Sequence, residues 1–437
     1  MIIAPSSDPG EHDSRRESGG EPGLIAPPSP SRYREASQPA DAHALFAEAR
    51  RRRRRIRLIA GAACLLGAAG AAGGIAASRP GTSQPSSGSA ERPAAHAPAF
   101  SLPAAAVAWV DSAGALHVGN VSDLRQQVLA RINSDNKVLI QTARRIYWAD
   151  GQSIRALELV TGARWRVATG DWASLSADRR QLYVATGNIH GNYPRALTVI
   201  PVSGHRPARP LTLPAGWHLS NYPNTAVAGG LVVQSYPGLG IWTARTGRVR
   251  ALARNASVVI GSWTPRGAGH SLLAWEPGGC AIWRCPLKIT NTSTMRTLTV
   301  RSPLRYGFII SQQGAAFSPD GTTLAAFASA TDPLSGAGPE SELTLINTTT
   351  GAVQLIPSAR LLTTEDAAWV TWLPGGDQLL AGAINANYAV NATTGATRPF
   401  YFFGPAKVGS RDISFSAITL PARALSTPIR NRIGLGS

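Results

Sequence analysis

Residues 316–325 read Ala-Phe-Ser-Pro-Asp-Gly-Thr-Thr-Leu-Ala, and this stretch is the clearest indicator of the fold. Pro319 sets φ at the second position of a tight turn, Asp320 is suited to hydrogen-bond the local backbone, and Gly321 accepts the left-handed conformation. Apolar residues stand on either side of the turn, as they do in half-buried strands. The stretch predicts two strands joined by a turn in which Asp320 has a structural rather than a catalytic role.

Two turn types recur along the chain. Trp372–Leu380 (WLPGGDQLL) and Leu175–Leu182 (LSADRRQL) repeat the first turn. The second turn is best written Thr-Thr-Gly, and glycine closes it because glycine tolerates positive φ. Its closing glycines are Gly162, Gly204, Gly247, Gly351 and Gly395, with degenerate copies at Ser122-Asp123 and Ser293-Thr294. Two turn types at a common period of about 45 residues predict a four-stranded unit that is repeated seven times.

The pattern Phe-Ser-Pro-Asp-Gly-x-x-Leu-Ala followed by a strand and a Thr-Gly turn resembles the blade signature of WD-repeat-like and TolB-like β-propellers. The resemblance covers residues 106–421 and is strongest in the sixth unit. It implies an all-β fold, a seven-bladed β-propeller. Ala156–Trp165 also resembles a quinoprotein-type repeat, but its Trp falls one residue early and no other unit repeats the match. We infer no quinone and no other cofactor.

The first unit has three candidate strands where the others have four. They are VAWVDS, ALHVGN and RQQVLA, and no strand precedes them. The C-terminal run Asp412–Leu420 (DISFSAITL) is an apolar strand left over after the seventh unit. We expect this strand to supply the innermost position of the first blade and to close the ring, which removes exposed sheet edges. Residues 422–437 remain as a C-terminal tail.

The N-terminal part is predicted to target the protein to the membrane rather than to form a folded domain. Residues 1–49 are polar and predicted to be a disordered cytoplasmic tail. Residues 58–77 lack charge over a length that matches a bilayer core, and 78–105 form a Pro/Ser/Gly/Ala-rich linker. The basic flank 50–57 keeps the N-terminus in the cytoplasm and so sets the topology, through Arg50, Arg51, Arg52, Arg53, Arg54, Arg55 and Arg57. An uncleaved signal anchor is favoured over a cleaved signal peptide or a lipoprotein modified at Cys64. The expected location is therefore the cell membrane, single-pass, with the propeller extracytoplasmic.

The charge does not identify a partner. The chain of 437 residues carries a net charge of +18, of which residues 1–57 contribute +3 and the remainder +15. The arginines are dispersed rather than interleaved with aromatics, and an exported domain does not meet nucleic acid, so nucleic-acid binding is excluded. Attraction to anionic lipid headgroups or wall polymers stays open, beside a basic surface produced by arginine-rich codon usage. That codon usage is typical of a GC-rich, actinobacterial genome.

Few residues of the sequence are candidates for catalysis, metal binding or ligand contact. The eight histidines are scattered without a metal-binding spacing, so no metal site and no catalytic residue are assigned. Cys280 and Cys285 flank four residues, and export makes a disulfide between them the favoured interpretation over two free thiols. Aromatic and histidine side chains in long connections are candidates either for a contact surface or for packing: His190, Tyr193, Trp217, His218, Tyr222 and Tyr236.

Three functions remain open. The leading one is a non-catalytic binding or scaffolding propeller tethered to the outer face of a bacterial cytoplasmic membrane, whose ligand is an unknown protein or envelope polymer. The alternatives are an extracytoplasmic propeller enzyme acting on a glycan or similar small substrate, and an envelope signalling protein. Acidic or histidine side chains converging on the central channel would favour the enzyme. A channel lined by small and apolar residues would favour the binder.

Overall fold

The computed structural model describes residues 100–111, 114–132, 139–186, 196–203, 208–219, 226–235, 238–265, 269–278, 285–308, 314–330, 340–362, 368–382, 387–400 and 416–436. The predicted N-terminal tail, basic flank and membrane-spanning segment lie outside these residues. Within the described part of the chain, no helix combines the length and the apolar character needed to cross a bilayer.

The described chain forms seven antiparallel sheets, which are the seven blades of a β-propeller. The strands of each blade are named from the innermost to the outermost. Blade one is β29 (Ser416–Leu420), β1 (Ala106–Val110), β2 (Ala115–Asn120), β3 (Gln126–Arg131). Blade two is β4 (Leu139–Gln141), β5 (Arg145–Asp150), β6 (Ser153–Glu158), β7 (Arg164–Thr169). Blade three is β8 (Trp172–Leu175), β9 (Gln181–Ala185), β10 (Ala196–Pro201), β11 (Arg209–Thr212).

The remaining blades follow the same order. Blade four has an inner position shared by β12 (His218–Leu219) and β13 (Ala226–Val227), then β14 (Gly230–Gln234), β15 (Leu239–Thr243), β16 (Arg248–Ala253). Blade five is β17 (Ala256–Trp263), β18 (Leu272–Pro277), β19 (Leu287–Asn291), β20 (Thr297–Val300). Blade six is β21 (Ala315–Phe317), β22 (Thr323–Ser329), β23 (Glu340–Asn347), β24 (Val353–Leu362). Blade seven is β25 (Trp369–Trp372), β26 (Gln378–Gly382), β27 (Asn387–Asn391), β28 (Thr397–Pro399).

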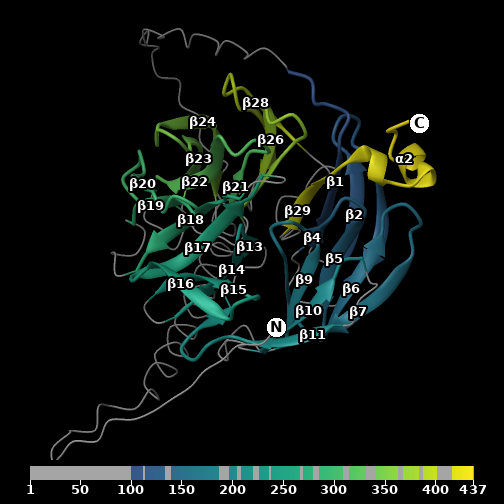
Figure 1. The fold of residues 1–437 in the computed structure, drawn as a ribbon. Helices are drawn as coiled ribbons and strands as arrows, with labels where there is room; N and C mark the ends of the chain where they lie inside the picture. Colours follow the sequence, from purple (N-terminus) through teal and green to yellow (C-terminus); the bar gives the residue numbers. More distant parts are fainter. Residues whose placement is uncertain are drawn as a thin grey trace, which may run out of the picture. The chain divides into compact units, whose positions relative to one another are not determined.

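The C-terminal strand closes the ring. β29 pairs antiparallel with β1 over its whole length, with Leu420 opposite Ala106 and Ser416 opposite Val110. Figure 1 shows this strand, in yellow, beside the blue β1 from the start of the propeller. β29 also contacts the inner strands of both neighbouring blades, β25 and β4. The prediction that the C-terminal run completes the first blade is therefore confirmed for Ser416–Leu420, while residues 412–415 of the run lie outside the described residues.

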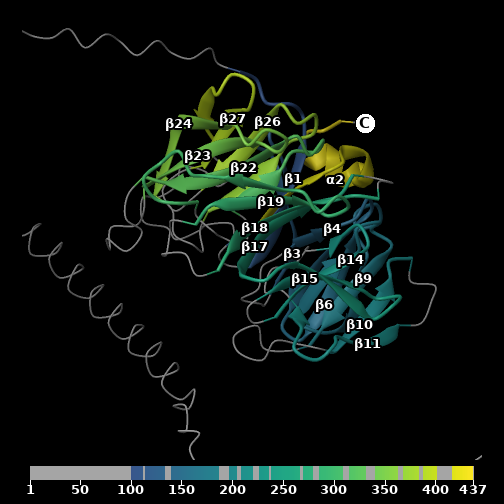
Figure 2. The same ribbon diagram turned by 60° about the vertical axis from the view of Figure 1, so that its left-hand side comes forward.

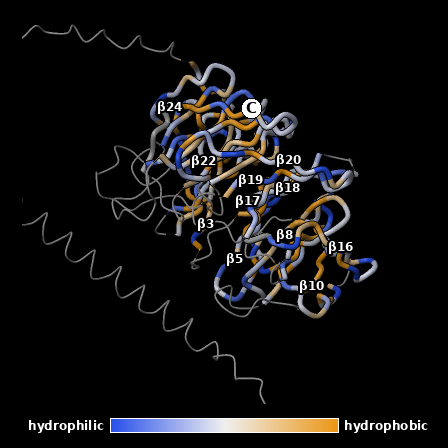
Figure 3. The backbone as a smooth tube through the Cα atoms, turned by 90° about the vertical axis from the view of Figure 1, so that its left-hand side faces the viewer, coloured by the Kyte–Doolittle hydropathy of each residue, from blue (hydrophilic) through white to orange (hydrophobic). Residues whose placement is uncertain are grey.

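The core consists of layers between the blades. Seven clusters of buried apolar side chains are present among the described residues, one at each interface between adjacent blades. Figure 3 shows hydrophobic stretches of the backbone, in orange, following the strands. Because each sheet is covered on both faces by its neighbours, the inner and middle strands are apolar on both sides, whereas the outermost strands alternate. β5 is buried at four consecutive positions, for example, while β7 has exposed and half-buried residues in turn.

The turn between the third and fourth strands is built in the same way in several blades. In blade six the Gly351 N–H donates to the Asn347 carbonyl at 2.9 Å. The Asn347 Oδ1 accepts from the N–H groups of Thr349 and Thr350 at 2.9 and 2.8 Å. Gly351 adopts φ +77°, which is why this position favours glycine. The degenerate turns of blades one and five place Leu124 (φ 62°) and Met295 (φ 57°) in the same conformation.

The strand order gives the ring two distinct faces. Connections between first and second strands, and between third and fourth strands, lie on one face, which we call the turn face. The other connections lie on the opposite face, which we call the loop face. The chain after β29 ends at the turn face in a short 3₁₀ helix (Ala422–Ala424) and in α2 (Thr427–Arg432), shown in yellow in Figures 1 and 2. The Ser426 N–H donates to the carbonyl of Leu159 in blade two at 2.9 Å.

Candidate functional site: a pocket at the turn face of blades three to five

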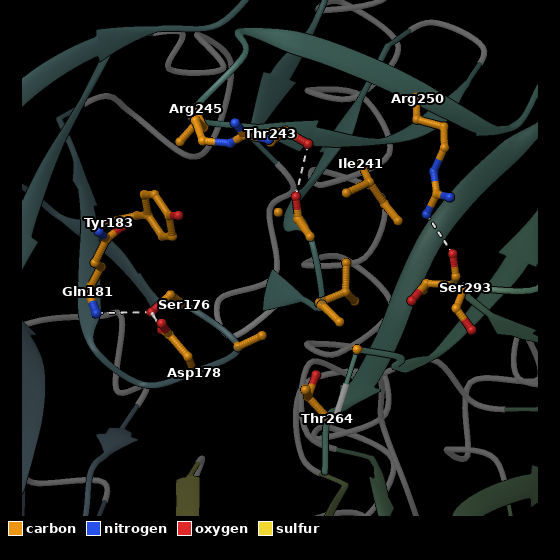
Figure 4. A pocket seen from close by; sticks show the side chains of 18 of the residues that line it. Ser176, Asp178, Gln181, Tyr183, Ile241, Thr243, Arg245, Arg250, Thr264 and Ser293 are labelled. Carbon is orange, nitrogen blue, oxygen red and sulfur yellow. Dashed lines mark hydrogen bonds between the residues drawn. The ribbon is translucent and has the colours of Figure 1, made fainter. Parts of the chain in front are cut away.

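A pocket of about 920 Å³ opens where the turns of blades three, four and five meet (Figure 4). Its walls come from three turns between first and second strands (residues 176–181, 228–230, and 264–265 with 269) and from two turns between third and fourth strands (243–245 and 292–293). A pocket of this volume is in the range of small-molecule sites and also accommodates a segment of a polymer. The site is therefore assembled from turns that are far apart in the sequence.

Buried hydroxyl groups make the blade-five side of the pocket rigid. Ser271 is fully buried and its hydroxyl accepts from the Ala228 N–H at 2.6 Å, which links blade five to blade four. The hydroxyls of Ser271 and Thr264 lie 2.6 Å apart, and the Ser271 N–H donates to the Thr292 hydroxyl at 3.1 Å. On the blade-four side, the Thr243 hydroxyl donates to the Gly229 carbonyl at 2.9 Å. These bonds hold the lining turns in a defined arrangement before any ligand arrives.

Two arginines give the pocket a positive rim. Figure 4 places Arg245 on one side and Arg250, beside Ser293, on the other. The Arg250 guanidinium donates to the Thr292 carbonyl at 2.5 Å, so its position is fixed between blades four and five. Arg245 is exposed in the turn that follows β15. Guanidinium groups in such a position are suited to carboxylate or phosphate groups of a ligand.

The blade-three side contributes Tyr183 and Asp178. The Asp178 carboxylate accepts from the Ser176 hydroxyl at 2.5 Å and from the Arg180 N–H at 3.0 Å, so it stabilises its own turn. Burial of the Tyr183 hydroxyl, and secondarily the charge of Asp178, raise the pKa of Tyr183, although Arg209 opposes this. Tyr183 therefore remains neutral at physiological pH and offers a hydroxyl to the pocket, not a phenolate base.

A smaller cavity of about 230 Å³ lies in the central channel of the ring. Inner strands and turns line it, from β29, β4, β8, β13 and β17. The described lining residues are small, apolar or neutral, with Arg179 as the charged one: Leu139, Gln141, Leu175, Ser176, Ala177, Arg179, Ala226, Ser262, Thr264 and Ile418. Acidic and histidine side chains do not converge among these described lining residues.

Asp320, the acidic residue of the stretch 316–325, lies in the turn between β21 and β22. Its carboxylate accepts from the Ser318 hydroxyl at 2.5 Å and from the Thr322 N–H and hydroxyl at 3.1 and 2.8 Å. Partial burial opposes ionisation of Asp320, but these hydrogen bonds outweigh it and lower its pKa. Gly321 has φ +76° and faces the indole ring of Trp263 in blade five. The Trp263 Nε1–H donates to the Pro319 carbonyl at 3.1 Å, so the turn also joins two blades.

The other predicted positions are spread over the molecule. Gly162, Gly247, Gly351 and Gly395 each have positive φ in their turns, whereas Gly204 lies outside the described residues. Cys285 is buried and disulfide-bonded. Its predicted partner Cys280 lies outside the described residues, as do the seven topology-setting arginines, so the pairing stays a prediction.

The predicted aromatic surface is only partly described. Trp217 and His218 lie in and next to β12, while His190, Tyr193, Tyr222 and Tyr236 are outside the described residues. Trp217 packs against the cluster between blades three and four and approaches Gly240. For Trp217, these contacts agree with a packing role rather than with a contact surface. Trp217 and His218 lie at the loop face, opposite the pocket.

In the described part of the chain, no cluster of three or more His, Cys, Asp or Glu side chains is placed to hold a metal ion. Blade one contains a histidine–carboxylate pair, with the His117 Nε2 and the Asp111 Oδ2 2.8 Å apart. The His117 ring stacks on Trp109 with ring centres 5.1 Å apart. Asp111 also accepts from the Ala115 N–H at 2.7 Å, so the pair fixes the β1–β2 connection.

Sequence reasoning missed the pocket residues. Tyr183, Arg245 and Arg250 each occupy an ordinary place in a turn or strand of their own unit. Aligning the seven repeat units with one another would have given a signal for these residues. Equivalent turns of consecutive units must lie on the same face of a ring, so residues in those turns are expected to be neighbours. The long connection 264–271 of blade five, where other units have a tight turn, was a second signal.

No known protein family matches the sequence, and no curated protein does. Among solved structures, the chain is similar to a proposed 6-phosphogluconolactonase from Bacteroides uniformis (13% identity, 72% of this chain and 99% of that one, TM-score 0.45). It is also similar to the periplasmic gluconolactonase of Pseudomonas aeruginosa (13%, 68% and 95%, TM-score 0.43). TolB from Acinetobacter baumannii is similar as well (10%, 72% and 67%, TM-score 0.43). At these identities the likeness concerns the fold alone.

Proposed function

We propose that this protein is a non-catalytic binding module of a bacterial envelope, which holds an anionic, hydroxylated ligand in the turn-face pocket of blades three to five. The supporting observation is the pocket itself, with about 920 Å³ of space and guanidinium groups from Arg245 and Arg250 at its rim. Tethering to the outer face of the cytoplasmic membrane through residues 58–77 is part of the proposal and follows from the sequence pattern.

The chemistry of the lining defines the ligand class. Arg245 and Arg250 offer charge-assisted hydrogen bonds, while Tyr183, Thr264 and Ser293 offer neutral hydroxyls. Val227 and Ile241 supply apolar contact beside them. This combination suits a sugar acid or a phosphate-containing polymer segment better than a neutral glycan or an apolar molecule.

The glycan-hydrolysing alternative requires a pair of acids in a suitable geometry. The acidic residue in the described lining of the pocket is Asp178. Its carboxylate accepts hydrogen bonds from the Ser176 hydroxyl and from the Arg180 N–H. A turn-stabilising carboxylate of this kind is a poor proton donor or nucleophile. The binding function is therefore the better supported of the two.

The test is isothermal titration of the purified full-length chain with polygalacturonate, polyglycerol phosphate and neutral dextran. We expect at least one anionic polymer to bind and dextran not to bind. Arg245→Glu should weaken binding at least about tenfold, because one charge-assisted contact is replaced by repulsion. Arg248→Glu is the matched control, since it makes the same charge change in the same turn outside the pocket lining. Equal losses in both variants, or equal binding of dextran, would contradict the proposal.

A further inference from the structure

The turn face carries exposed arginines on every blade from the first to the fifth. They lie in the turns or at the strand ends beside them, and the C-terminal segment adds Arg423 and Arg432. The blade residues are Arg125 in blade one, Arg144 and Arg164 in blade two, Arg179, Arg180 and Arg209 in blade three, Arg245 and Arg248 in blade four, and Arg296 in blade five. Figure 2 shows α2 beside the blue and teal blades of this half of the ring.

Acidic side chains do not balance this face. Asp123 lies 3.6 Å from Arg125 in a solvent-accessible pair, and Asp178 is held within its own turn. Glu158, at the end of β6, is paired with Arg145 at 2.8 Å and so is neutralised by an arginine of the same blade. In the described turns of blades six and seven on this face, the charged residues are Asp320 and Asp377. The positive charge is thus gathered over five adjacent blades.

The loop face is different. Arg155 is paired with Asp150 there at 2.5 Å, and the connections also carry Asp111, Asp171 and Glu340. Its described arginines are therefore interspersed with acids. A surface shaped only by arginine-rich codon usage would not distinguish the two faces, and this one does.

The chain also enters the propeller at the turn face. β1 begins at Ala106, opposite Asn120, which starts a turn of that face. Just upstream, the Gln378 side chain donates to the Ser101 carbonyl at 3.1 Å and Arg398 donates to the Phe100 carbonyl at 3.3 Å. These bonds fix the entry point between blades seven and one. The described chain therefore enters the propeller at the basic face.

We propose that the turn face docks on an anionic lipid surface, with its arginines binding headgroup phosphates. Guanidinium groups pair with phosphate through two parallel hydrogen bonds, and each basic side chain near an anionic bilayer strengthens binding about fivefold. A tether that starts from the same face keeps the basic face close to the bilayer, which raises its effective concentration there. This inference assigns a surface and a partner beyond the pocket ligand, and it rests on the membrane tether that is part of the proposed function.

The experiment reconstitutes the full-length chain into vesicles of phosphatidylcholine, with or without roughly one third phosphatidylglycerol. In a Cys64→Ala background, one donor fluorophore is attached at Thr161→Cys on the turn face or at Gln152→Cys on the loop face. Energy transfer to an acceptor-labelled lipid headgroup then reports which face lies near the bilayer. Both positions are exposed in blade two, so the two labels differ in face and not in blade.

We expect strong transfer from the turn-face label, and weak transfer from the loop-face label, on vesicles that contain phosphatidylglycerol. The signal should fall at about 0.5 M salt, where screening is strong. Joint reversal of Arg125, Arg144, Arg164 and Arg296 to Glu should lower the ratio of docked to undocked molecules more than about 100-fold. The matched control reverses Arg131, Arg254, Arg301 and Arg305 on the loop face, with the same change in net charge, and should preserve docking.

Equal transfer from the two labels, or equal loss in the two reversal variants, would overturn the proposal. Docking that requires added polyglycerol phosphate on neutral vesicles would assign the face to a polymer and would also overturn it. The four turn-face arginines are not part of the pocket lining. Polymer titration of the same variants therefore separates a failure of lipid docking from a failure of the proposed function.

Discussion

Single turn residues connect the blades as well as their own strands. Gly321 both takes a left-handed conformation and lies against the Trp263 ring, where an added Cβ would approach ring atoms to 2.6 Å. Gly376 is the equivalent residue of blade seven and has φ +82°. A Cβ added to Gly376 would lie 3.6 Å from its nearest neighbour, the Pro319 Cδ. The two glycines therefore share a backbone conformation and differ in the space around them.

This difference gives a prediction about packing between blades five and six. Gly376→Ala should lower the free energy of unfolding by about 1 kcal/mol, which is the cost of a side chain in the left-handed region. Gly321→Ala adds a clash with an indole that is itself hydrogen-bonded to Pro319, and should cost about 2 to 4 kcal/mol. Denaturant melts of the two variants provide the measurement. Equal losses would show that Trp263 moves aside without cost.

Glu276 is an acidic group buried on β18, with 4% of its surface exposed, and burial raises its pKa to about 8. In the unfolded chain the carboxyl titrates near its ordinary value of 4.5. Between these two values the folded state keeps a proton that the unfolded state has released, so raising the pH favours unfolding. Stability should therefore fall from about pH 5 to about pH 8, by on the order of a few kcal/mol, and then level off.

Glu276→Gln removes the titrating group and should flatten this part of the stability profile. Thermal melts of both proteins across pH 5 to 9, roughly the range spanned by the two pKa values, make the comparison. Asp377→Asn is the control, because Asp377 is an exposed carboxylate and its removal should leave the slope of the native profile in place. An unchanged slope in Glu276→Gln would show that another group causes the pH dependence.

At the scale of elements, the strands were predictable and the last helix was not. The strands follow from repetition, since each unit shows the same alternation between the same two turns. α2 carries local signals, with Ser426 as N-cap and Pro near its first position, yet it spans six residues. A helix of that length does not form on its own, so its existence depends on the apolar cluster against which it packs. Most other residues of that cluster belong to blades one and two, more than two hundred residues upstream, and no local pattern indicates them.

Packing should accordingly account for the stability of this C-terminal element. Ile433 is fully buried in the cluster between blades one and two, and Ile433→Ala should cost about 3 kcal/mol. Thr427→Ala changes an exposed residue of the same helix and should cost less than about 0.5 kcal/mol. Urea denaturation followed by circular dichroism measures both. Equal effects would indicate that the helix is not docked in solution.

At the scale of the whole molecule, the ring explains why the candidate site was harder to predict than the fold. Residues 176–178, 228–230 and 292–293 each belong to a turn that is complete in itself. Only closure of the ring places these turns around one space, and the shape of that space depends on side chains such as Tyr183 and Arg245. The sequence pattern specifies how blades repeat, but it does not specify which turns leave a cavity between them.

Ring closure itself is the last prediction. Removing residues 411–437 deletes β29, which exposes the edge of β1 and opens the contacts with β25 and β4. Because a strand between two blades is lost, cooperative unfolding of the full ring should disappear and the protein should aggregate. Removing residues 422–437 alone deletes the helical cover and keeps β29, so the transition should remain cooperative at a lower melting temperature. Thermal unfolding followed by near-ultraviolet circular dichroism, with size-exclusion chromatography, distinguishes the two. A cooperative, monomeric transition after the longer deletion would show that blade one holds together as three strands.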